Sequence, residues 1–252
     1  MYSCDKFEKS VDKPSNTYYI LKIKPQRTMS SPDYYGSKLD SSDYKHISEE
    51  AIATGNKLNL AKYTYKDSTG LERTCEVVSR QTKQCHEDSD CVGTLAVLRR
   101  MLKYDCLVLV KQYRPALKAF TLEFPAGLVQ SSESAEETAV RELKEETGYT
   151  FTSIKHESPA TALDPGLSNC TMKVVSVEID GDNPLNKIPI QKPADEDHIE
   201  VVHIPIDDLL QRLNEYSEQG IIIDSRVYCF AIGHAVGSKH SLNCNRMTID
   251  AQ

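Results

Sequence analysis

Three glutamates, Glu142, Glu145 and Glu146, have the residue type and spacing that most clearly suggest chemistry. On a helix, their offsets of three and four residues would place them within an arc of about 100°. Like charges on one helix face repel each other, at a cost of roughly a few tenths of a kcal/mol per pair. A divalent cation would offset that cost, and Mg²⁺ suits carboxylates that also hold substrate phosphates. Taken alone, the three residues leave a solvated acidic helix face as the alternative.

The ends of this helix are marked in the sequence. Ser134 followed by Glu137 is a capping-box pattern, which is typical of a helix start. Gly148 suits the position just past a helix end. We therefore predict a helix over Ala135–Thr147. Its apolar side, expected to pack on a sheet, consists of Val140, Leu143 and Thr147.

The same stretch has further fixed positions that a solvated acidic face does not require. Gly127 and Glu133 precede the Arg-Glu pair at 141 and 142, and Gly148 closes the stretch. The pattern resembles the Nudix box: Gly, five residues, Glu, seven residues, Arg-Glu, an aliphatic, one residue, Glu-Glu, one residue, Gly and an aliphatic. Every fixed position from Gly127 to Gly148 matches. The one departure is Tyr149, which stands at the final aliphatic position.

The resemblance implies a Mg²⁺-dependent hydrolase of diphosphate bonds, with Mn²⁺ as a substitute ion. Glu142, Glu146 and the backbone carbonyl of Ala126 would bind the metal. Glu145 would assist catalysis, and Arg141 would orient the glutamates by salt bridges.

The general base is expected in the acidic loop Ala194–His198. In the branch of the family that this chain resembles, a glutamate on the corresponding loop takes the proton from water. Strict alignment gives Asp197, whereas Glu196 is one residue away and has the expected side chain. Both are candidates, and a merely solvent-exposed loop is the alternative.

Segments outside the box resemble the ADP-sugar pyrophosphatase branch of the family, and the similarity extends from about Ile47 to about His234. The segments are Lys111–Pro115, Glu123–Gly127 and Asp164–Thr171. The resemblance implies a homodimer in which an N-terminal β-region exchanges across the interface and helps to close both active sites.

The same resemblance implies a set of substrate contacts. Arg114 would bind the diphosphate, because a guanidinium presents paired donors to phosphate oxygens. Glu76 and Arg80 would reach the substrate from the partner subunit, and Leu128 and Asp164 would line the side near the terminal ribose. For either arginine alone, a solvent-facing strand residue is the alternative.

The sequence departs from the branch in having no tryptophan. Related enzymes stack adenine between two tryptophans, and the corresponding positions here are Lys57 and Cys75. Aromatic stacking contributes roughly 1–3 kcal/mol per base. Tyr63 and Tyr65 are nearby in sequence and are possible substitutes.

Around these residues the sequence predicts an α/β fold, a Nudix α/β/α sandwich with a mixed sheet, preceded by a small N-terminal β-region involved in dimerisation. We expect a flexible tail over 1–45, the β-region over 46–90, the hydrolase domain over 91–240 and a C-terminal tail over 241–252. A short helix is predicted over Ile47–Thr54, ended by Gly55. Strands are predicted over 18–23, 58–65, 72–80, 92–100, 106–114, 120–124, 172–179 and 200–204, and further helices over 207–219 and 225–235.

Composition limits the class of protein. With 37 acidic against 30 basic residues the net charge is −7, which disfavours a nucleic-acid-coating surface. The first ten residues lack the apolar core of a secretory signal, and no stretch approaches a membrane span. None of the eight cysteines has CxxC spacing, so a zinc site is not expected. Reduced thiols in a cytoplasmic protein, with the nucleus as a second location, fit this pattern.

The sequence therefore predicts Mg²⁺-dependent hydrolysis of ADP-ribose or related ADP-sugars to AMP and a sugar 5-phosphate. One alternative is hydrolysis of another nucleoside diphosphate-linked substrate, such as an oxidised nucleotide. Another is a Nudix module that binds ADP-ribose without cleaving it, whose expected sign, loss of a box glutamate, is not present here.

Overall fold

The computed structural model describes residues 40–81, 89–151, 153–192 and 198–249, with side chains up to residue 238. The chain divides into two units, Met1–Tyr44 and Lys45–Gln252. The described part of the first unit contains one short 3-10 helix, η1 (Ser41–Asp43). The strand predicted over 18–23 lies outside the described residues.

In the described part of the second unit, three strands form an antiparallel sheet: β1 (Lys45–Thr54), β2 (Leu58–Lys66) and β3 (Glu72–Arg80). The prediction of a helix over Ile47–Thr54 is therefore wrong. β1 pairs with β2 along its length, with Ala51 opposite Ala61, and this ladder pairs the backbone groups of β1 that face β2. So short a segment is marginal as a helix in water, and the cross-strand pairing outweighs its weak helical preference.

Nine further strands in the described residues form a mixed sheet, with the order β12-β6-β5-β4-β10-β8. β11 is antiparallel to β5, β7 to β4 and β9 to β10, whereas β10 runs parallel to β4. The predicted strands from 92 onward are confirmed to within about two residues. The strands are β4 (Cys91–Arg99), β5 (Cys106–Arg114), β6 (Ala119–Glu123), β7 (Ala126–Leu128), β8 (Ile154–Glu157), β9 (Thr161–Ala162), β10 (Thr171–Asp180), β11 (Glu200–Pro205) and β12 (Ile222–Ile223).

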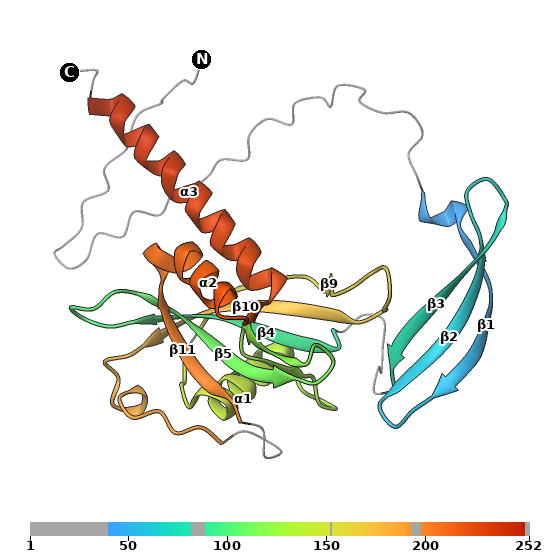
Figure 1. The fold of residues 1–252 in the computed structure, drawn as a ribbon, viewed down its shortest axis with the longest axis horizontal. Coiled ribbons are helices and arrows are strands. Elements are labelled where there is room, and N and C mark those ends of the chain that lie inside the picture. The colour runs from blue at the N-terminus through green and yellow to red at the C-terminus, as the bar shows by residue number, and fades with distance from the viewer. Residues whose placement is uncertain (1–39, 82–88, 152, 193–197, 250–252) are drawn as a thin grey trace, which may run out of the picture. The chain divides into compact units, whose positions relative to one another are not determined.

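Helices cover both faces of this sheet (Figure 1). α1 (Ala135–Thr147) lies on one face, and α2 (Leu209–Glu218) and α3 (Ser225–Ile249) lie on the other. Short 3-10 helices, η2 (Pro184–Asn186) and η3 (Ile206–Asp208), lie in the connections. The predicted α/β/α sandwich with a mixed sheet is confirmed.

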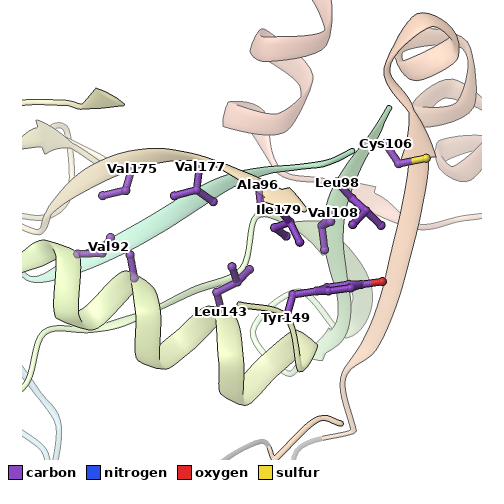
Figure 2. Packing of buried hydrophobic residues seen from close by; sticks show 11 residues of the cluster. Val92, Ala96, Leu98, Cys106, Val108, Leu143, Tyr149, Val175, Val177 and Ile179 are labelled. Atoms are coloured by element: carbon purple, nitrogen blue, oxygen red, sulfur yellow. The ribbon is translucent and has the colours of Figure 1, made fainter. Parts of the chain in front are cut away.

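Each helical layer has its own apolar core. Under α1, the core contains Leu143 and Tyr149 together with side chains from β4, β5 and β10 (Figure 2). Under α2 and α3, it contains Leu209, Leu213 and Val227 against β5 and β6. The continuous apolar run Leu107–Val110 is fully buried because it supplies both layers in alternation.

Two helix predictions need correction. Val140 is 44% exposed, because the buried stripe of α1 runs through Ala139, Leu143 and Glu146 rather than through Val140. α3 continues to Ile249, well past the predicted end at Ala235. Among the described residues, none of the helices has both the length and the apolar content needed to cross a bilayer.

β4 and β5 separate near Gly127, the first residue of the box pattern. β4 pairs with β5 only through Ala96–Leu98, and its first residues, Cys91–Gly93, pair with β7 instead. Between them, the Thr94 N–H donates to the carbonyl of Pro125 (2.8 Å). The end of β6 and the start of β7 are thereby placed beside α1.

Candidate active site

The ends of α1 are fixed as the sequence predicts. The Glu137 N–H donates to Ser134 Oγ (3.1 Å), and the Ser134 N–H donates to Glu137 Oε2 (2.8 Å). At the other end Gly148 has φ +77°, and a Cβ there would lie 2.5 Å from the backbone nitrogen of Ile190. Glycine is required by the left-handed backbone and by the close approach of this segment.

The Glu142 carboxylate lies directly against the backbone of Gly127 in β7. A Cβ on residue 127 would lie 1.7 Å from both Cδ and Oε1 of Glu142. The carboxylate is held in this place by Arg141, whose Nη1 donates to Glu142 Oε1 (2.6 Å). The first glycine of the box therefore makes room for the first glutamate of the Glu142–Glu146 pair.

Arg141 joins several acidic groups of the box. Its Nε and Nη2 donate to the two carboxylate oxygens of Glu133 at 2.7 and 2.8 Å, and Nη2 also donates to the carbonyl of Leu128 (3.0 Å). Its Nη1 lies 3.5 Å from Glu145 Oε2. The bonds from Arg141 to Glu133, with further hydrogen bonds from Gln130 and Thr138, lower the pKa of Glu133 to about 2. The predicted orienting role of Arg141 thus has a geometric basis.

Glu146 is the most deeply buried carboxylate of the pair, with 8% of its surface exposed. Its Oε2 accepts a hydrogen bond from the Ala126 N–H (3.0 Å). Burial raises the pKa of Glu146 to about 8; the Ala126 hydrogen bond opposes this rise, and the neighbouring Glu142 adds to it. Burial also raises the pKa of Glu142, against the opposing effect of Arg141. Without a cation, this pair of carboxylates is electrostatically unfavourable.

An ion pair between the exposed Arg114 and the buried Glu123, which the sequence pattern did not reveal, adjoins Glu146. Arg114 Nε and Nη2 each donate to an oxygen of Glu123, both at 2.7 Å, and the Thr121 hydroxyl donates to Glu123 Oε1 (2.6 Å). Burial raises the pKa of Glu123, but these donors outweigh it and leave the pKa below its ordinary value. Arg114 and Glu123 both influence the pKa of Glu146, so the pair belongs to the same site.

The segment after Pro189 secures the C-terminal half of α1. The Gln191 side-chain amide donates to the Glu146 carbonyl (2.6 Å) and to the Ile199 carbonyl (3.0 Å). The Lys192 N–H donates to the Glu145 carbonyl (2.8 Å). Gln191 was also missed from the sequence, where nothing distinguishes it from other polar loop residues.

The donor set fits a hard divalent cation. Within the described ranges, no three His, Cys, Asp or Glu side chains converge on one point. Two carboxylates, Glu142 and Glu146, instead both lie against the Ala126–Gly127 backbone. Mg²⁺ commonly uses one or two carboxylates, with its other ligands coming from carbonyls, waters and substrate phosphates.

The structure brings most of the predicted site together. Box residues Glu142, Glu145, Glu146 and Arg141 surround the Ala126–Leu128 strand, and Arg114 adjoins them. The predicted bases, Glu196 and Asp197, lie outside the described residues.

The predicted substrate residues on β3 and in the 164–169 loop are less closely tied to the box. The Val78 N–H donates to the Leu167 carbonyl (2.9 Å), so β3 lies beside the loop that follows Asp164. Arg80, at the end of β3, is close enough to Cys91 of the same chain for its positive charge to lower the pKa of that thiol, against the larger raising effect of burial. Glu76 and Asp164 are exposed, and no bond between either side chain and the described box residues is seen.

The raised pKa of Glu146 gives the metal-free protein a pH-dependent stability. The unfolded chain loses this proton near the ordinary value of 4.5, whereas the folded chain keeps it to about 8. The stabilising contribution is complete below pH 4.5 and is lost as the pH rises through about 8. The free energy of unfolding can be measured with urea in EDTA, at about pH 5 and at about pH 9. For wild-type protein it should fall between these two pH values by on the order of 1–4 kcal/mol more than it does for Glu146→Gln.

Two controls accompany this measurement. Glu136→Gln, an exposed change on the same helix, should follow the wild-type profile. Added Mg²⁺ should reduce the wild-type loss, because metals bind the deprotonated carboxylate. Parallel profiles for wild type and Glu146→Gln would contradict the inferred titration.

Comparison with known proteins places these features in a family. A NUDIX domain model matches residues 90–224. ADP-sugar pyrophosphatase of Mus musculus is 44% identical over 201 residues, which cover 78% of this chain and 91% of that protein. ADP-ribose pyrophosphatase of Saccharomyces cerevisiae is 31% identical over 217 residues, covering 86% and 92% of the two chains.

A solved structure described as an ADP compounds hydrolase has a similar fold, with a TM-score of 0.55 at 19% sequence identity. The match covers 81% of this chain and 98% of that one. Together with the glycines and glutamates placed around α1 and β7, these matches show that the chain belongs to the Nudix family.

Proposed function

We propose that this protein hydrolyses the diphosphate bond of ADP-ribose and related ADP-sugars, giving AMP and a sugar 5-phosphate. The observation that carries the proposal is the placement of the Glu142 and Glu146 carboxylates against the Ala126–Gly127 backbone, with Arg114 close enough to Glu146 to influence its pKa. The names of the mouse and yeast relatives support the substrate class, because the similarity spans nine-tenths of each relative.

Glu142, Glu146 and the Ala126 carbonyl would hold Mg²⁺, with Mn²⁺ as a substitute. When bound, the ions supply positive charge to the diphosphate and lower the pKa of the attacking water. Arg141 keeps Glu142 and Glu145 aligned through its bonds at the base of the site. The burial of Glu146 strengthens these electrostatic effects on its side of the site, since fewer waters screen them.

Glu196 or Asp197 would take the proton from the attacking water, with Glu145 assisting. Support comes from the described residues just before them in sequence. Gln191 and Lys192 donate to the backbone carbonyls of Glu146 and Glu145, so the described residues that precede this loop lie beside the helix that carries the box glutamates. A carboxylate close to its proton donor is the geometry that general-base catalysis needs.

Arg114 would contact the diphosphate, with Leu128 and Asp164 near the terminal ribose. Arg114 now donates to Glu123, and it would donate to the diphosphate when substrate binds. Both partners are negatively charged, so the guanidinium would stay paired before and after binding. Glu76 and Arg80 would contribute from the partner subunit of a homodimer, through the three-stranded sheet.

Tyr63 is the best candidate for stacking on adenine. It lies directly opposite Cys75 in the pairing of β2 with β3, so it is next to the position where related enzymes have a tryptophan. Directly opposed residues have Cβ atoms about 5 Å apart. The ring of His46 already contacts the Tyr63 ring edge-to-face, with centroids 5.6 Å apart.

The protein is proposed to act in the cytoplasm, and also in the nucleus. Cys75, Cys91, Cys106, Cys170 and Cys229 are free thiols, which is the usual state in a reducing compartment.

Incubation of the full chain with ADP-ribose and Mg²⁺ tests the proposal. We expect AMP and ribose 5-phosphate in equal amounts, with no products in EDTA. A panel that includes ADP-glucose and an oxidised nucleotide should show faster turnover of the ADP-sugars. Faster cleavage of the oxidised nucleotide would favour the alternative hydrolase, and calorimetric binding of ADP-ribose without AMP release would favour a binding module.

A further inference from the structure

A polar cavity lies beside the turn between β4 and β5, and none of the box glutamates lines it. Its volume is about 260 Å³. Its polar lining comes from the β4–β5 turn, from the second residue after α1 and from the segment after β10: Arg100, Lys103, Tyr149, Asp182, Asn186 and Lys187. None of these residues has a part in the proposed hydrolysis.

The charge of this lining is opposite to that of the whole protein. Three basic side chains, Arg100, Lys103 and Lys187, face one acidic side chain, Asp182, in a chain whose net charge is −7. Asp182 Oδ2 already accepts a hydrogen bond from the Met101 N–H (2.6 Å). In the described part of the chain, none of the three basic residues forms a salt bridge. The cavity thus concentrates unpaired positive charge.

Arg100 is held in place but lacks a counter-charge. Its Nε is buried and has no acceptor among the described residues, and its Nη2 donates to the sulfur of Cys106 (3.6 Å), a weak acceptor. A Cβ on Gly181 would lie 2.4 Å from Arg100 Cγ, so glycine at 181 leaves the space that the arginine stem fills. A partly buried guanidinium without an anionic partner is costly, and an anion in the cavity would offset that cost.

The other walls are rigid. Tyr149, the residue that departs from the Nudix pattern, is buried, and its hydroxyl is 3.0 Å from His203 Nε2. Figure 2 shows its ring close to Leu98 and Val108 beneath the sheet. The Asn186 side chain is fully engaged, since it bonds to Thr150 and to the Asp180 carbonyl. The lining is therefore preformed around the three basic groups.

We propose that this cavity binds a small phosphate anion, either inorganic phosphate or a compact phosphate monoester. One guanidinium and two ammonium groups match the several oxygens of a tetrahedral phosphate. The volume is below the roughly 300–1,000 Å³ of common ligand pockets, which excludes a whole nucleoside diphosphate sugar. The site is independent of the proposed hydrolysis, and either can fail without the other.

The test follows the Nε–H resonance of Arg100 in full-length protein labelled with ¹⁵N-arginine. The resonance is assigned by its loss in Arg100→Lys. Inorganic phosphate and ribose 5-phosphate are each titrated at constant ionic strength in EDTA, with chloride as the reference anion. We expect a saturable shift with phosphate, and at least about tenfold weaker binding in Lys103→Gln/Lys187→Gln, because charge-assisted bonds are lost.

A control variant shows whether the phosphate-induced shift depends on the lysines that line the cavity. Lys66→Gln/Lys155→Gln removes two lysines that do not line the cavity, and it should leave the phosphate affinity within about twofold. Saturation by both ligands supports a monoester site, and saturation by inorganic phosphate alone supports a site for the free anion. Shifts equal to those with chloride, or a response abolished by Arg114→Gln but not by the cavity variant, would overturn the proposal.

Discussion

Replacing Glu146 by glutamine is expected to lower the turnover of ADP-ribose by about 10²-fold or more while the protein stays folded. The amide retains an oxygen that can accept the Ala126 N–H, so the local packing survives. It removes the negative charge by which Glu146 would bind a cation. Steady-state rates with saturating Mg²⁺, together with thermal unfolding of the metal-free protein, measure the two effects separately.

The structure also predicts the sign of the stability effect. Since burial raises the pKa of Glu146 to about 8, the ionised form is disfavoured in the metal-free protein. Glu146→Gln should therefore be at least as stable as wild type at high pH without metal, although it is nearly inactive with metal. Mg²⁺ should raise the unfolding temperature of wild type more than that of the variant.

Glu136→Gln is the matched control, because Glu136 lies on the same helix but is exposed. Its turnover should stay within about twofold of wild type, as is usual for surface changes remote from a site. If Glu146→Gln retained wild-type turnover with Mg²⁺ present, Glu146 could not be a metal ligand, and the proposed site would have to be abandoned.

The sequence was sufficient to predict α1 because local signals at both of its ends agree with its tertiary role. Ser134 and Glu137 cap its start, and Gly148 both ends the helix and admits the neighbouring backbone of Ile190. The β5 run Leu107–Val110 was equally clear, since an apolar run of that length is buried on both faces. In both places, local propensity and long-range packing favour the same structure.

The errors arose where long-range pairing decides the structure. β1 is a strand because β2 lies alongside it, and nothing within residues 47–54 encodes that partner. β7 has only three residues, Ala126–Leu128, and exists because the first residues of β4 are left unpaired by β5. Short elements of this kind carry too few side chains to give a periodic pattern.

In the candidate site, too, the sequence did not reveal which residues far apart in the chain pair with each other. The spacing of the box identified its glutamates, but it could not reveal that Glu123 forms a bidentate pair with Arg114. A signal was available, because Glu123 interrupts an otherwise apolar strand immediately before the box. A buried charge of this kind requires a partner, and the sequence alone does not say which arginine provides it.

Gly127→Ala is expected to reduce turnover by about 10²-fold, because the added methyl group would displace the Glu142 carboxylate. Its Cβ would lie 1.7 Å from Cδ and Oε1 of Glu142, so the carboxylate must turn away. That movement breaks the Arg141–Glu142 bond of 2.6 Å and takes the Glu142 carboxylate away from the Ala126–Gly127 backbone that Glu146 also contacts. Overpacking of this kind costs about 1–3 kcal/mol of stability, which unfolding in urea would measure.

A double-mutant cycle isolates the cause. If Gly127→Ala acts by displacing Glu142, then adding it to Glu142→Ala should cost little further turnover, because the displaced side chain is already absent. Gly233→Ala is the control, since a Cβ at residue 233 meets nothing within 4 Å in α3 and should leave turnover unchanged. Mn²⁺ affinity, measured by electron paramagnetic resonance, should fall in Gly127→Ala and not in Gly233→Ala. Fully additive losses of turnover in the cycle would show instead that residue 127 acts on catalysis independently of Glu142, and that the close contact between them is incidental.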